Sequence, residues 1–112
     1  MKITIGSTTF TAALYDNPSA DVLKAKLPFA ITMTELNANE KYYYFPGTFP
    51  QNATVPGTIR EGDLMLYENN CLVLFYKTIN TSFPYTKIGH IDNTVGLKDA
   101  LGKGNVMVKF EE

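Results

Sequence analysis

The sequence predicts a mainly β protein, a closed eight-stranded barrel with two short capping helices. Three observations support this prediction. The run Cys71–Tyr76 is apolar at consecutive positions, so this strand needs cover on both faces. About eight strand-like segments are joined mostly by short connections, which favours an antiparallel sheet. Closing such a sheet removes its exposed edges. The 112 residues contain no repeat and no visible boundary, so we expect one domain over 1–112.

The first segments predict a hairpin followed by a helix. Apolar and polar residues alternate on both sides of Gly6 in residues 2–15. Asp16 or Asn17 can cap a helix over 18–26, where Pro18 suits the first turn. Pro28 stops this helix. Its apolar face is formed by Ala20, Leu23 and Leu27.

The middle of the chain predicts two strands, a long loop and the central hairpin. Alternation predicts a strand over 29–35, and an aromatic-rich strand follows over 41–45. Residues 46–61 contain three prolines and form one long irregular segment, and such segments are often functional or mobile. The hairpin occupies 62–77, and a second loop follows over 78–85.

The C-terminal part predicts a strand, a short helix and a last strand. The strand covers 86–91, and Asn93 is a candidate cap for the helix. Gly102 is a suitable helix stop, and residues 105–110 alternate as a strand.

Composition narrows the function. The net charge is -1 and the basic residues are scattered, so we expect no nucleic-acid partner and no basic membrane-binding patch. Cys71 is the only cysteine, which excludes an internal disulfide, and we expect it to be a small buried hydrophobe. No apolar stretch approaches a membrane span, and the chain begins directly as a strand, so we expect a cytoplasmic protein unless a leader sequence has been removed.

No catalytic constellation is evident. His90 is the only histidine, so no metal site built on several histidines is expected, and we expect no cofactor. His90 and Asp92 share a strand face, where they suit either a general base with its orienting partner or a local surface pair.

The order of elements resembles the small bacterial cyclophilin-like fold proteins. The resemblance rests on Tyr15–Ala20 before the first helix, Gly62-Asp63 opening a strand, the polar tip Glu68–Asn70, and Leu74–Tyr76. Ile88–Asp92 before the second helix completes it, so the similarity spans nearly the whole chain. It implies a closed cyclophilin-like barrel of eight strands.

True cyclophilins isomerise X-Pro bonds in a shallow groove on the barrel wall, using an arginine of a Phe-His-Arg motif, a Gln-Phe-Phe motif and a nearby tryptophan or histidine. Here the matching strand reads Tyr42–Pro46, and the second stretch reads Leu74–Tyr76 without glutamine. The chain has no tryptophan, and its only arginine, Arg60, lies in the long loop.

These features favour a non-catalytic module that binds a peptide or a small molecule, because aromatic residues gather on the middle strands and their loops. The same residues also suit simple packing. The alternative is a divergent peptidyl-prolyl cis-trans isomerase in which Arg60 acts on the proline, an argument from fold alone. A partner domain for another enzyme is a third possibility, and the sequence does not specify the oligomeric state. The candidate binding residues are Tyr42, Tyr44, Arg60, Phe75 and Ile88.

Overall fold

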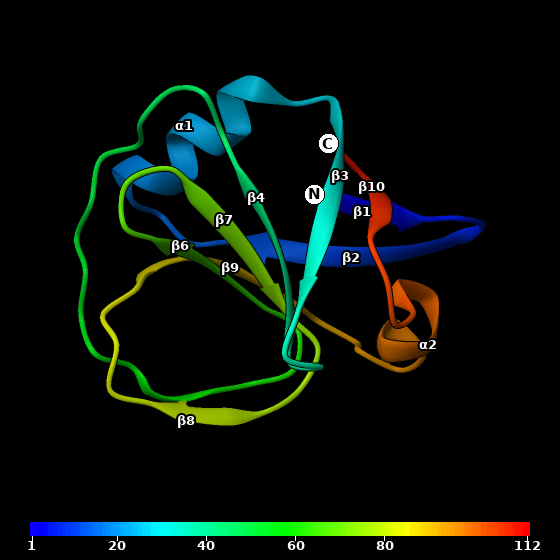
Figure 1. Ribbon diagram of the computed structural model, residues 1–112. Coiled ribbons are helices and arrows are strands. Elements are labelled where there is room, and N and C mark those ends of the chain that lie inside the picture. Colours follow the sequence, from blue (N-terminus) through cyan, green and yellow to red (C-terminus); the bar gives the residue numbers. More distant parts are fainter.

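The computed structural model describes residues 1–112 and confirms the closed barrel. Its strands are β1 (Lys2–Ile5), β2 (Thr8–Leu14), β3 (Phe29–Leu36), β4 (Glu40–Tyr44), β6 (Asp63–Tyr67), β7 (Cys71–Phe75), β9 (Thr86–Ile91) and β10 (Val106–Glu111). They pair antiparallel in the closed order β1-β10-β3-β4-β7-β6-β9-β2 (Figure 1). Every edge of this sheet is therefore paired.

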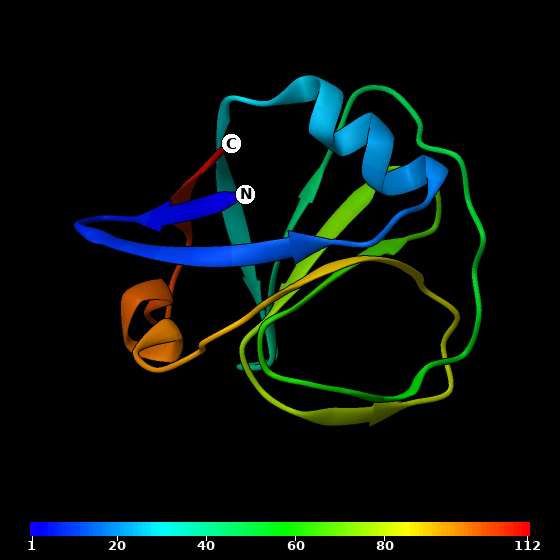
Figure 2. The same cartoon turned by 180° about the vertical axis from the view of Figure 1, so that it is seen from behind.

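Two short helices close the barrel from opposite sides (Figures 1 and 2). The bounds predicted for α1 (Pro18–Lys26) are confirmed, and Asn17 caps it by accepting a hydrogen bond from the Ala20 amide. The cap predicted for α2 (Leu97–Leu101) is wrong. Asn93 accepts from the Val95 amide instead, which forms a turn ahead of the helix. Neither helix is long and apolar enough to cross a membrane.

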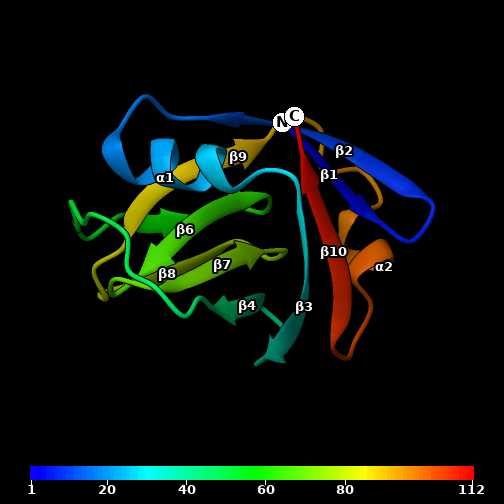
Figure 3. The same cartoon turned by 90° about the horizontal axis from the view of Figure 1, so that it is seen from above.

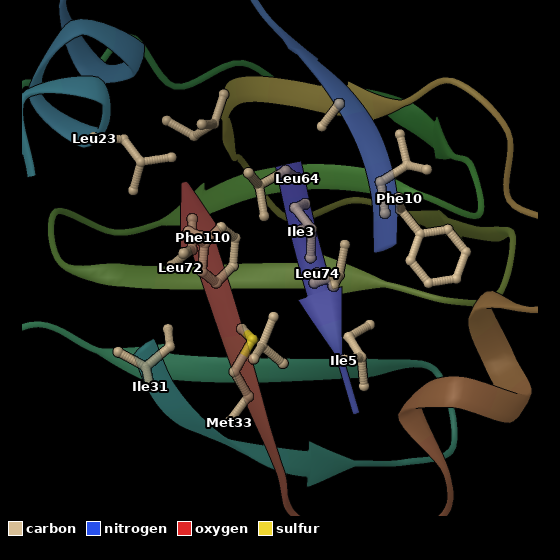
Figure 4. Packing of buried hydrophobic residues seen from close by; sticks show 14 of the residues in the cluster. Ile3, Ile5, Phe10, Leu23, Ile31, Met33, Leu64, Leu72, Leu74 and Phe110 are labelled. Carbon is tan, nitrogen blue, oxygen red and sulfur yellow. The ribbon is translucent and has the colours of Figure 1, made fainter. Parts of the chain in front are cut away.

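The main core fills the barrel interior, where side chains from facing strands meet (Figure 4). The helices contribute Leu23 at one side and Leu97 and Leu101 at the other. Because side chains alternate along a strand, β7 sends Leu72 and Leu74 inward and its other three residues outward. All five are buried, which confirms that this strand is covered on both faces.

The outer cover of β7 is a small ribbon that the sequence pattern did not predict. It consists of β5 (Gly57–Ile59) and β8 (Ile79–Thr81), which pair antiparallel and lie below the barrel wall in Figure 1. Both were expected to be irregular, because three residues are too few to show alternation. Ile59 of β5 is fully buried and belongs to a second cluster with Met65, Cys71, Val73, Phe75 and Tyr85.

The segment before β5 is held against the barrel at several points. The Phe49 ring enters the main core, and its amide donates to the Asn69 carbonyl over 2.7 Å. Ser19 of α1 donates to the carbonyl of Pro50. Thr54 pairs with Tyr85 in an isolated bridge. The long loop thus curves around the outside of the wall that contains β4, β7 and β6 (Figure 3).

A partly buried ion pair joins the β3–β4 hairpin to the end of α2. Lys41 is fully buried, and its ammonium group lies 2.9 Å from Glu35 Oε1. It also donates to the carbonyls of Gly102 and Gly104, so its three protons are all used. Tyr76 donates to the same Glu35 oxygen over 2.6 Å. We call these groups the Lys41 clamp.

Candidate functional site

The outer face of β4 is the starting point of the site. Strand alternation places Glu40, Tyr42 and Tyr44 on this face, while Lys41 points into the barrel. Tyr42 pairs with Val73 and Tyr44 with Cys71 of β7. Tyr42 and Tyr44 therefore stand beside the second cluster, next to the β5–β8 ribbon.

A pocket of about 450 Å³ lies between this wall, the β3–β4 turn and β8. We call it the outer pocket. Its size falls within the usual range for sites that hold small ligands. It is lined by Leu36, Asn37, Asn39, Glu40, Tyr42, Tyr44, Tyr67, Cys71, Val73, Ile79, Asn80, Thr81, Phe83 and Tyr85.

Aromatic rings form much of this lining and brace one another. Tyr42 and Tyr44 meet edge to face with centroids 5.7 Å apart. Tyr67 and Tyr85 lie 5.5 Å apart, and Phe75 supports Tyr85 from beneath at 5.7 Å. Such pairs hold the rings in defined orientations. Tyr44 and Phe83 are exposed, at 54% and 60%, so part of this aromatic surface faces solvent.

The electrostatics of the outer pocket depend on Glu40, the only charged residue in its lining. Burial, and then the negative charge of Glu35, raise the pKa of the Glu40 carboxyl above its ordinary value. Burial is also the main reason why the pKa of Cys71 rises to about 11 and that of Tyr85 to about 12. The negative charge of Glu40 contributes to the raised pKa values of both Cys71 and Tyr85, so Glu40 interacts electrostatically with both groups.

The lining does not assemble a nucleophile with a base. Because its pKa is raised, Cys71 stays a neutral thiol at neutral pH, and a thiol is a poor nucleophile. His90 and Asp92 lie on or beside β9, outside the outer pocket, with a 3.5 Å separation between Nε2 and Oδ1. The ring of Tyr15 lies 5.7 Å from that of His90. No group of three side chains that could hold a metal ion is present.

A sequence profile described as the cyclophilin-like family matches residues 3–111, nearly the whole chain. The chain belongs to the cyclophilin-like family. No curated protein and no solved structure gives a significant match. Family membership agrees with the eight-stranded closed barrel and its two helices.

The cyclophilin-like barrel brings together only part of the predicted binding set. Tyr42 and Tyr44 line the outer pocket. Phe75 is fully buried beneath it, in contact with Tyr85. Ile88 is fully buried in the main core and so offers no surface to a ligand. The side chain of Ile88 points from β9 into the barrel, and the sequence alone did not show which face of the strand this residue occupies.

Arg60 does not belong to the pocket lining of the cyclophilin-like barrel. It lies in the turn between β5 and β6, where its amide donates to Asp63 Oδ2 over 2.8 Å. Its side chain is exposed and forms no ion pair. The order of strands in the ribbon explains this position, because β8 lines the outer pocket and β5 does not.

Sequence reasoning missed Glu40 and the polar residues at the edge of the pocket. One signal was available: Glu40 is two residues before Tyr42 and therefore shares its strand face. The contributions of Asn37, Asn39 and Asn80 had no comparable signal. Asn37 and Asn39 lie in the turn of the β3–β4 hairpin, directly before Glu40. Asn80 lies in a strand too short to show a pattern, and pairing with the distant β5 fixes its position.

Proposed function

We propose that the protein is a non-catalytic binding module that takes a small molecule or a segment of peptide into the outer pocket. One observation carries this proposal: a pocket of about 450 Å³, rich in tyrosine, lies on the outer wall of the barrel. Its rings offer flat apolar surface, and the neighbouring amides and hydroxyls offer hydrogen bonds. This combination is typical of ligand sites.

The alternative, a divergent prolyl isomerase, has less support from the site. Rotation about an X-Pro bond has a high barrier because the amide is planar, and a donor near the proline lowers it by favouring the twisted form. The lining contains no arginine, lysine or histidine, and Arg60 lies outside it. The available donors are the hydroxyls of tyrosine and Thr81, the thiol of Cys71 and the amides of asparagine.

The test compares binding and catalysis in one set of samples. ¹⁵N-labelled protein is titrated with a proline-containing tetrapeptide and with a panel of small aromatic compounds, and the cis–trans exchange rate of the same peptide is measured. We expect amide shifts confined to β4, β7 and β8 with at least one compound, and no acceleration of exchange at micromolar protein.

Two exposed tyrosines provide a matched pair of variants. Tyr44→Ala removes a ring from the outer pocket, whereas Tyr15→Ala removes one outside it. We expect about a tenfold loss of affinity in the first variant and no change in the second, because a ring contact contributes about 1 kcal/mol or more. Absence of localised shifts with every compound would contradict the proposal. Accelerated exchange would favour the isomerase instead.

A further inference from the structure

Glu40 is the unusual group of the outer pocket. Its side chain belongs to a residue that is only 9% exposed, at the start of β4. Within the protein its carboxyl group accepts no hydrogen bond and forms no ion pair. Its backbone position is fixed by strand pairing, opposite Phe75 on one side and Leu36 on the other.

Nothing in the fold neutralises this carboxylate. Its oxygens still touch solvent in the open pocket. Even partial removal of a carboxylate from water is costly unless a cation or several donors replace the lost hydration. The adjacent Lys41 cannot serve, because it points to the opposite face and its protons are used by Glu35, Gly102 and Gly104. Glu35 adds negative charge nearby and raises the pKa of Glu40 further.

The surroundings of Glu40 suit a cation. The faces of aromatic rings attract cations, and Tyr42, Tyr44, Tyr67 and Tyr85 line the same cavity. Glu40 would repel an anion, and the lining contains no positive side chain that could attract one. A neutral ligand could donate a hydrogen bond to the carboxylate but would leave its negative charge uncompensated. A metal ion is less suitable, since no three ligating side chains come together.

We propose that the outer pocket binds a ligand through an ammonium group, with Glu40 as the counter-ion and the tyrosine rings as the walls. The ammonium belongs either to a free amine or to a lysine side chain of a peptide, because the shared chemistry is an N–H donor with a positive charge. This inference rests on the proposed function and specifies the ligand class for the same site.

The test uses three probes of similar shape and different charge: benzylammonium, benzyl alcohol and benzoate. Each is titrated into ¹⁵N-labelled protein at pH 7.5 and low salt. Wild-type protein is compared with Glu40→Gln, which keeps the shape of the side chain and removes its charge. Glu68→Gln is the matched control, because Glu68 is exposed and lies near Tyr44 and Cys71 but does not line the pocket.

We expect wild-type protein to bind benzylammonium about tenfold more tightly than benzyl alcohol, since a charged hydrogen bond adds about 1.5 kcal/mol or more. The preference should fall to twofold or less in Glu40→Gln and persist in Glu68→Gln. Nα-acetyl-lysine methylamide, compared with butylammonium, identifies the source: tighter binding of the former indicates a peptide, and tighter binding of the latter a free amine.

Equal binding of benzyl alcohol and benzylammonium at the pocket would overturn the ammonium inference and leave the binding module intact. A preference that survives in Glu40→Gln would also overturn it. If no probe shifts the pocket residues, both proposals fail. Should Glu40→Gln lose its dispersed spectrum, the comparison of the three probes on wild-type protein still decides.

Discussion

Glu40 and Lys41 are neighbours in β4, and both are buried, but they point to opposite faces of one barrel wall. On the inner face, Lys41 finds a carboxylate and two carbonyls, so every proton has an acceptor. On the outer face, the Glu40 carboxyl has no partner within the protein. The same strand thus holds one charge that is fully compensated and one that is not.

The difference separates a charged group that has its partners within the fold from one that does not. The Lys41 clamp ties two hairpin strands to the end of α2 and faces a core that is mostly aliphatic. The outer face is aromatic and open to solvent at Tyr44 and Phe83. A charged side chain that has no partner within the protein, beside an open aromatic surface, is a candidate contact for a ligand.

The largest effect on stability is expected from disrupting the Lys41 clamp on the inner face of β4. Lys41→Met removes the ammonium, leaves two carbonyls without their donor and leaves Glu35 with only Tyr76 and the Ala38 amide, so we expect a loss of about 3–5 kcal/mol in the free energy of unfolding. Urea denaturation measures it. Lys87→Met, at an exposed position of β9, is the control and should change stability little. An equal effect of both variants would contradict the role of the clamp.

A smaller loss is expected at Tyr76, which donates to Glu35. Tyr76→Phe removes a hydrogen bond to a charged group, worth about 1.5–3 kcal/mol. Burial, followed by the hydrogen bond and charge of Glu35, raises the pKa of Tyr76 to about 12. The unfolded chain therefore releases this proton first, near pH 10, and wild-type stability falls as the pH rises from there towards 12.

Denaturation between pH 8 and pH 11.5 measures this alkaline loss. It should be shallower in Tyr76→Phe than in wild-type protein, with the remainder due to Tyr85 and Cys71, whose pKa values are also raised. Identical slopes in the two proteins would show that the Tyr76 hydroxyl does not contribute to the pH dependence.

On the outer side, replacement of the charge should stabilise the protein. Glu40→Gln removes an unpaired buried carboxylate, and we expect a gain of about 1 kcal/mol at pH 7. Because the pKa of Glu40 is raised, its penalty appears as the pH rises through that pKa, and the gain should shrink as the pH falls towards 4.5. Urea denaturation midpoints at pH 7 and pH 4.5 measure this gain. A variant that is less stable than wild-type protein at pH 7 would contradict the inference that the charge of Glu40 is uncompensated.

Glu35 should show the opposite dependence on pH. Burial alone would raise its pKa, but hydrogen bonds from Tyr76, Lys41 and the Ala38 amide outweigh burial and lower it below 4.5. Its stabilising contribution is therefore present above pH 4.5 and is lost as the pH falls through the lowered pKa.

The smallest effect is expected at Arg60, which belongs neither to the Lys41 clamp nor to the lining of the outer pocket. Arg60→Ala should change the free energy of unfolding by less than about 0.5 kcal/mol, because the Asp63 contact uses the backbone amide. It should also leave probe binding at the outer pocket unchanged. Loss of binding in this variant, measured with the same titration, would extend the site towards the turn after β5.

Local sequence patterns were sufficient for most of the barrel. The α1 bounds follow from the Asn17 cap and Pro28, and the covered strand β7 follows from consecutive apolar residues. The sequence pattern did not predict the β5–β8 ribbon or the correct partner of Asn93, because neither depends on local sequence alone. A three-residue strand has no period to detect, and the partner that Asn93 selects depends on the path of the chain before α2.

The sequence by itself determined the closed antiparallel barrel and the aromatic character of β4, because alternation and turn residues act over a few positions. Only the tertiary structure decided which residues line the outer pocket. It buried Ile88, placed Arg60 outside the lining and brought Asn80 and Thr81 into the same pocket lining as Glu40. It also decided that Lys41 is paired and Glu40 is not. Their partners lie far away along the chain, and the value of a buried charge depends on what folding brings beside it.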